Sequence, residues 1–277
     1  MDLFCCPHRP PSPRRPAGRP AALLLAALLC LGAAPPSLAQ AAGARAKAVP
    51  HPVTSPAEGV VPVYATRLPP SQTVRYVISR GPWSGHGELV WEAQDTRYHA
   101  RLDGRVAGFK VITWDSTGQV DPHGIAPVRF TDERRGKALL AASFQRAAGK
   151  ITYSGSDATH PWLPGAQDRL SWMVQIAAIA NANPDVLATG QRISLYVSGA
   201  RGDADVWTFQ AMGVEKVAIG GASVSAVRLL REPRKVNDTR VEVWLDPNLH
   251  HLPVRARLTS APENETLELV RRASDPS

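Results

Sequence analysis

Four histidines in turn-like contexts are the first candidates for chemistry in this chain. His86 lies in SGHGE, His123 lies in DPHGI, and His250 and His251 are adjacent in LHHLP. His86 and Glu88 have the two-residue spacing that places side chains on one face of a strand, where both could bind a metal ion. An incidental surface pair accounts for this spacing better, because no H-E-x-x-H motif accompanies it.

Motifs for nucleophilic catalysis and phosphate binding are missing from the sequence. No G-x-S-x-G elbow occurs, and Gly220-Gly221 lacks the Lys and Ser/Thr of a phosphate loop, so it is typical of a hairpin turn. Asp168 and Ser171 have the spacing of a helix cap. We therefore predict a non-enzymatic protein without a cofactor or metal. An envelope hydrolase using His86, His123 and Asp121 is a minor alternative.

The tryptophans are the stronger candidates for a binding role. Core packing is the first explanation for Trp residues inside predicted strands or a helix, but an apolar ligand would contact the same population. Trp83 and Trp162 lie in Gly/Pro-rich loops and could form the rim of a pocket. The predicted ligand-binding residues are Trp91, Trp114, Trp172, Met173, Ile176, Trp207 and Trp244.

Alternating apolar and polar residues dominate the rest of the chain. In GELVWEA, for example, Leu89, Trp91 and Ala93 point to one side and the glutamates to the other. Short turns join about ten such segments, so neighbouring strands should be antiparallel. A sheet of this size curls, and the sequence therefore predicts a mainly β fold: a curved antiparallel sheet that forms a half-open barrel.

One stretch, Pro164 to Pro184, has the pattern of a helix. Asp168 is a plausible N-cap and Asn183-Pro184 ends the segment. Its apolar surface is nearly continuous, so the helix must be buried over most of its girth. We expect it to pack on, or plug, the concave face of the sheet.

The first 39 residues have the features of a cleavable signal peptide. Four arginines precede the apolar core from Ala21 to Ala34, and Ser37 and Ala39 are the small residues of a cleavage site. We expect residues 40–71 to be a flexible Pro/Ala-rich linker, residues 72–273 a single β-rich domain and residues 274–277 a disordered tail. The expected location is the periplasm.

Composition limits the partners of the exported chain. Its three cysteines all lie within residues 1–39, so the mature domain must be stable without disulfides. Loss of residues 1–39 removes four basic residues and one acidic residue and lowers the net charge from +8 to +5. The remaining arginines are dispersed, which argues against nucleic acid. Contact with a membrane would be peripheral at most.

Three motifs resemble one family of exported proteins. GIAPVRFTDERRGK (Gly124 to Lys137), PGAQDRLSWMVQIA (Pro164 to Ala177) and VEVWLDPNLHHLPVRAR (Val241 to Arg257) are similar to the domain-of-unknown-function family 3108 of Gram-negative bacteria. Its pattern is more distantly similar to lipoprotein-localisation carriers, whose half-open barrel holds acyl chains under helices. The resemblance implies an apolar or lipid-like ligand between the concave sheet and the helix.

A second hypothesis needs no ligand. The domain could be an interaction or scaffold module of the cell envelope that binds a protein partner through its loops. That hypothesis predicts a filled core, whereas a carrier should contain a cavity.

Overall fold

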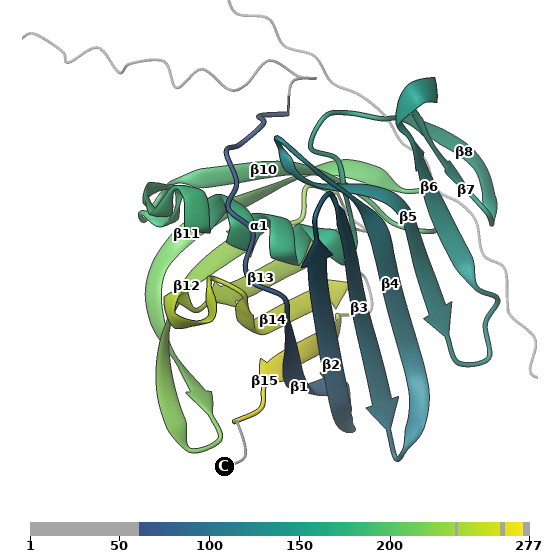
Figure 1. Ribbon diagram of the computed structural model, residues 1–277. Helices are drawn as coiled ribbons and strands as arrows, with labels where there is room; N and C mark the ends of the chain where they lie inside the picture. The colour runs from purple at the N-terminus through teal and green to yellow at the C-terminus, as the bar shows by residue number, and fades with distance from the viewer. Residues whose placement is uncertain (1–60, 236–237, 261–263, 274–277) are drawn as a thin grey trace, which may run out of the picture. The chain divides into compact units, whose positions relative to one another are not determined.

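The computed structural model describes residues 61–235, 238–260 and 264–273 (Figure 1). The predicted signal peptide, residues 40–60 of the predicted linker and the predicted tail lie outside these residues. The fold below is that of the described part of the chain.

One curved sheet of fifteen strands makes up most of this fold. Its order is β8-β7-β6-β5-β4-β3-β2-β1-β15-β14-β13-β12-β11-β10-β9, so strands from the two ends of the described chain, β1 and β15, are neighbours. Every pair is antiparallel except β9 with β10. The strands are β1 (Gln72–Arg80), β2 (Trp83–Gln94), β3 (Arg97–Val106), β4 (Phe109–Asp121), β5 (Gly124–Arg134), β6 (Leu140–Gln145), β7 (Lys150–Tyr153), β8 (Ser156–Pro161), β9 (Gln167–Asp168), β10 (Arg192–Ser198), β11 (Ala204–Ile219), β12 (Ala222–Arg231), β13 (Thr239–Leu245), β14 (Pro253–Ser260) and β15 (Glu265–Arg271).

The predicted fold class is confirmed, with more strands than expected. The alternating segments of the sequence correspond to β2, β3, β4, β6, β7 and β10 to β15, whereas β1, β5, β8 and β9 were not expected. β5 is the instructive one, since it contains Pro127, and proline is normally kept out of central strands. The register shifts between Thr117 and Gly118 of β4, which pair with Arg129 and Pro127 of β5, so Val128 is an extra residue. This bulge accommodates the proline.

Alternation along the strands builds the core on the concave face. In β1, Val74, Tyr76 and Ile78 are buried, while Val77 is exposed on the other side of the sheet. The Tyr76 hydroxyl donates a hydrogen bond to the carbonyl of Pro253, 2.8 Å away, so this buried polar group is satisfied.

The one α-helix of the described residues, α1 (Ser171–Ala182), lies against the concave side of the sheet (Figure 1). All of its residues except Ala182 are buried, as the continuous apolar pattern predicts. Its buried Gln175 makes two hydrogen bonds to the start of β5: the side-chain oxygen accepts from Ile125 N–H at 2.9 Å, and the amide donates to the His123 carbonyl at 2.7 Å. The helix is therefore fixed to the sheet by polar as well as apolar contacts. Short 3-10 helices lie at Arg146–Ala148, Pro184–Leu187 and Pro247–Leu249.

The extended segment before β1 packs across the helix. The N–H of Arg67 donates to the Ala178 carbonyl at 2.9 Å, and the Trp91 indole donates to the Pro69 carbonyl at 3.0 Å. Tyr64 accepts a hydrogen bond from the N–H of Ser194 in β10. The packed structure thus includes residues 61–71, which formed the end of the predicted linker.

Candidate functional site

The helix end of the barrel is filled with aromatic side chains. Trp172 is only 1% exposed; its ring stacks on Phe209 with centroids 5.2 Å apart and lies 5.7 Å from Trp207. Met173 and Ile176, on the same helix, are also buried. Four of the predicted ligand-binding residues are therefore core residues on α1 or, for Trp207, beside Trp172.

Two arginines, Arg169 and Arg231, pack against Trp207. The guanidinium carbons of Arg169 and Arg231 lie 4.6 and 4.7 Å from the Trp207 ring centroid, a cation–π arrangement. Arg231 is 2% exposed, and its charge is balanced by both carboxylate oxygens of Asp238 at 2.8 Å. Burial nevertheless lowers the pKa of Arg231.

A buried carboxyl group organises the start of α1. The N-cap residue of α1 is Leu170 and not the predicted Asp168. One oxygen of Asp168 nevertheless accepts hydrogen bonds from the N–H groups of Leu170 and Ser171 at 2.8 and 2.7 Å, so it satisfies two backbone donors at the start of the helix. The other accepts from the Ser116 hydroxyl, which is 2.8 Å from the Tyr98 hydroxyl. Burial raises the pKa of Asp168 to about 6, although these hydrogen bonds act in the opposite direction.

The remaining predicted residues lie in three different places. Trp91 is fully buried beside Tyr98, with ring centroids 5.6 Å apart. Trp244 belongs to a separate apolar cluster with Val217 and Val254. Its indole donates to Glu215 at 2.8 Å. Trp114 alone of the seven predicted residues is among those that line the cavity described next.

A cavity of about 880 Å³ opens to solvent on the concave side of the sheet, beyond the start of α1. Its volume is within the range of sites that take a small-molecule ligand. Its most buried lining residues are mainly apolar: Ile78, Trp114 and Phe130 are largely buried, together with the carboxylate residue Asp132. Leu258 and Leu267, which face each other in the β14–β15 register, are partly buried in the same lining.

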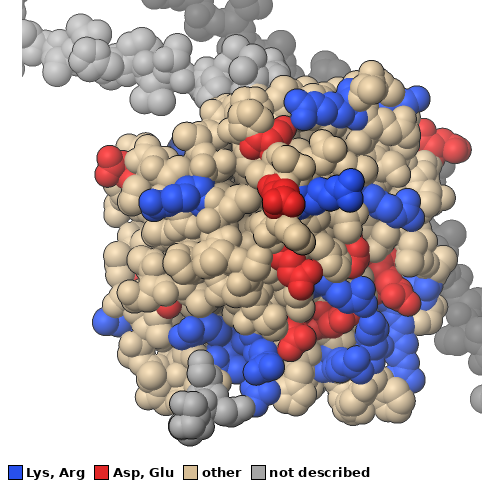
Figure 2. Space-filling view, in the orientation of Figure 1, with Lys and Arg blue, Asp and Glu red and all other residues tan. Residues whose placement is uncertain are grey.

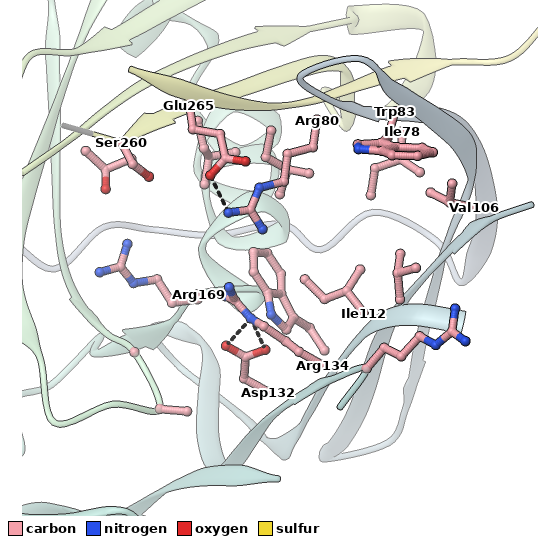
Figure 3. A pocket seen from close by; sticks show the side chains of 18 of the residues that line it. Ile78, Arg80, Trp83, Val106, Ile112, Asp132, Arg134, Arg169, Ser260 and Glu265 are labelled. Carbon is pink, nitrogen blue, oxygen red and sulfur yellow. Dashed lines mark hydrogen bonds and ion pairs between the residues drawn. The ribbon is translucent and has the colours of Figure 1, made fainter. Parts of the chain in front are cut away.

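Charged and apolar side chains are mixed around the cavity. Figure 3 shows Arg80, joined to Glu265, near Ile78 and Trp83, and Asp132 joined to Arg134 across the cavity from them. The cavity is thus amphipathic. On the molecular surface in Figure 2, basic and acidic side chains are interleaved toward the lower edge.

Exposed aromatic side chains lie at the mouth. Trp83, which follows the β1–β2 turn, is 67% exposed, and Phe109, at the start of β4, is 56% exposed. Sequence reasoning named Trp83 as a rim candidate but missed Phe109. Phe109 directly follows Ala107-Gly108, which form a turn in which both residues have positive φ. Its position next to a glycine-containing turn was the feature of the sequence that could have marked it as a rim residue. Trp162, the other rim candidate, is not part of this lining.

The candidate catalytic histidines do not come together. His86 is exposed on β2, while His123 lies in the β4–β5 turn, where its N–H donates to Asp121 at 2.8 Å. His251 bonds through Nδ1 to Asn181 near the end of α1 at 2.7 Å, and burial lowers the pKa of its ring. Within residues 61–235, 238–260 and 264–273, no three His, Cys, Asp or Glu side chains are grouped to hold a metal ion.

Comparison with family models gives one match. The model described as "Protein of unknown function (DUF3108)" matches residues 73–270, most of the chain. The chain belongs to this family. The prediction from the three motifs is confirmed, and the structure places two of them in contact: Gln167 and Gln175 of the helix motif both bond to the backbone of Ile125 in the β5 motif.

The comparison with curated proteins found no match. Among solved structures, a β-barrel-like protein of the DUF1849 family from Brucella abortus is similar with 13% identity and a TM-score of 0.48 over 74% of this chain and 96% of that one. Mycobacterium tuberculosis lipoprotein LppX is similar with 10% identity and a TM-score of 0.25 over 73% and 85%. In the part of the chain that the structure describes, no helix is long and apolar enough to cross a membrane.

Proposed function

We propose that this member of the DUF3108 family is a non-enzymatic binding protein that holds a hydrophobic or lipid-like molecule in the cavity on its concave face. The observation that carries the proposal is the cavity itself, which has a buried apolar wall and an open mouth. Each Å² of apolar surface removed from water there contributes about 25 cal/mol to binding.

The cavity, rather than the underside of α1, is the proposed binding site. The predicted space between the sheet and the helix is occupied by Trp172, Met173 and Ile176, all buried. A ligand there would have to displace close-packed side chains, which costs several kcal/mol. A ligand in the open cavity displaces solvent only.

The same cavity favours a ligand-binding protein over a scaffold module. A scaffold module that binds a partner through its loops has no need of an open, partly apolar cavity of this size. An amphipathic cavity with aromatic side chains at its mouth supports a ligand instead.

We further propose that the protein acts in the periplasm after removal of residues 1–39. The support is the apolar core and small-residue site of that segment, together with a mature chain that needs no disulfides. Edman sequencing of protein purified from the periplasm should begin at Gln40. Recovery of the full-length chain from the cytosol would contradict the proposal.

The binding function is testable with a neutral apolar fluorophore, N-phenyl-1-naphthylamine, titrated into the purified protein. We expect saturable fluorescence enhancement, and a loss of affinity of about tenfold or more in Leu258→Glu, which places a charge on the apolar wall. Val77→Glu is the matched control, because it adds the same charge to the opposite face of the sheet, beside the cavity residue Ile78.

Near-ultraviolet circular dichroism of both variants establishes that each is folded. Absence of saturable binding by the wild-type protein would overturn the proposed function. Equal binding by folded Leu258→Glu would show that the fluorophore occupies another place.

A further inference from the structure

The charges that line the cavity do not balance. Among the described residues, the lining includes the arginines Arg80, Arg134, Arg135, Arg169 and Arg201 and the acidic residues Asp132, Asp203 and Glu265. These five positive and three negative side chains have a net charge of +2.

Three of the arginines have their own carboxylate. Arg80 bonds to Glu265 and Arg169 to Asp203. Arg134 bonds to both oxygens of Asp132, at 2.9 and 3.1 Å. These pairs are neutral and account for every acidic residue of the lining.

Arg135 and Arg201 supply the excess charge. Arg201 lies 3.9 Å from a carboxylate oxygen of Asp132, which is too far for a hydrogen bond. The same carboxylate already accepts a hydrogen bond from Arg134. Arg135 makes no ion pair with any described residue, and its guanidinium lies over the ring of Phe109, 4.3 Å from the centroid. Both side chains are exposed, so their donors are open to a ligand.

We propose that the cavity selects an anionic amphiphile, with its apolar chain on the deep wall and its carboxylate, sulfate or phosphate head group bound at the mouth by Arg135 and Arg201. This assignment rests on the proposed binding function and adds the chemical class of the ligand. A guanidinium presents a planar fork of donors that matches the oxygens of such a head group.

The arrangement of the lining gives the ligand one orientation. The most buried apolar residues, Ile78, Trp114 and Phe130, lie at depth, whereas Arg201 is 55% exposed. The apolar chain of a ligand would thus be removed from water at the deep end. Its head group would remain near the mouth, in contact with solvent and with the two arginines. A neutral amphiphile would make the apolar contacts but would not balance the excess positive charge of Arg135 and Arg201.

The test compares twelve-carbon ligands that differ only in the head group: laurate, dodecanol and dodecylamine, each displacing N-phenyl-1-naphthylamine at pH 7.5. We expect laurate to bind about tenfold or more tightly than dodecanol, and dodecylamine to bind most weakly. The double variant Arg135→Gln/Arg201→Gln should bind laurate no better than dodecanol.

The control is Arg129→Gln/Arg192→Gln, which removes the same net charge at two exposed arginines outside the lining. It should retain the preference for laurate. Equal binding of laurate and dodecanol by the wild-type protein would overturn the inference while the proposed function stands. Binding of neither ligand nor fluorophore would overturn the proposed function, and a preference that survives in Arg135→Gln/Arg201→Gln would contradict the assignment of these two residues.

Discussion

The two ends of the concave face are built from similar residues and do different things. At the end covered by α1, Trp172, Trp207 and Phe209 contact one another and leave almost no exposed surface. At the cavity end, Trp83 and Phe109 line an open mouth and are 67% and 56% exposed. Aromatic side chains thus stabilise the first region, whereas at the second they remain available to a ligand.

The helix explains the difference. It fills one part of the curved sheet and is fixed there by Asp168 at its start, Gln175 in its middle and Asn181 near its end. The sheet continues beyond it toward the β1–β2 and β3–β4 turns, where no helix of the described chain covers it (Figure 1). An insertion that stabilises one end of a barrel therefore also defines where the cavity lies.

The largest expected effect is at the closed end. Trp172→Ala should lower the free energy of unfolding by about 3–5 kcal/mol, because it removes a fully buried side chain and leaves a cavity beside Phe209. Urea denaturation followed by circular dichroism measures the loss. A change below about 1 kcal/mol would mean that the end around α1 is not tightly packed.

A smaller effect, with a defined pH dependence, is expected at Asp168. Its pKa of about 6 in the folded protein exceeds the ordinary value of 3.8, so the folded state holds the proton more tightly than the unfolded state. The contribution of Asp168 to stability therefore falls as pH rises from about 4 to 6, by about 3 kcal/mol in all. Asp168→Asn keeps a side-chain oxygen that can accept from Leu170 and Ser171, but it does not titrate. Its free energy of unfolding relative to that of the wild type should therefore rise by about 3 kcal/mol between pH 4 and pH 6.

Urea denaturation of both proteins at pH 4, 5, 6 and 7 measures this difference. Asp185→Asn, the same substitution at an exposed residue, controls for the loss of a charge. If the stability difference between the wild type and Asp168→Asn stays constant with pH, the carboxyl group does not titrate as the buried site requires.

The smallest effect on stability is expected at the cavity mouth. Trp83→Ala makes the same chemical change as Trp172→Ala but at a side chain that is 67% exposed, so the free energy of unfolding should change by no more than about 0.5 kcal/mol. Its affinity for N-phenyl-1-naphthylamine should fall by a few-fold as one wall of the mouth is removed. A destabilisation as large as that of Trp172→Ala would contradict the distinction between the two ends.

Local patterns were sufficient to predict the fold class, the buried helix and the family. Period-two alternation and the continuous apolar surface of residues 171–182 are properties of neighbouring residues, so they can be read directly. Strand β9 could not be predicted in this way, because two residues become a strand only by pairing with Val197 and Ser198 of β10.

The cavity could not be located from the sequence for the same reason. Its lining combines residues from β1, β4, β5, the β10–β11 turn and β14, which only the curvature of the sheet brings together. Sequence reasoning selected large apolar residues, and this criterion cannot separate Trp114, in the cavity wall, from Trp172, in the filled core. The excess of arginine over carboxylate is likewise a property of the assembled surface.

The most direct test of the account is a crystal structure of the protein with 12-bromododecanoate, in which anomalous scattering locates the bromine. We expect a bromine peak in the cavity among Ile78, Trp114 and Leu258, with the carboxylate at Arg135 and Arg201. A peak between α1 and the sheet, beside Met173 and Ile176, would contradict it and place the binding site under the helix.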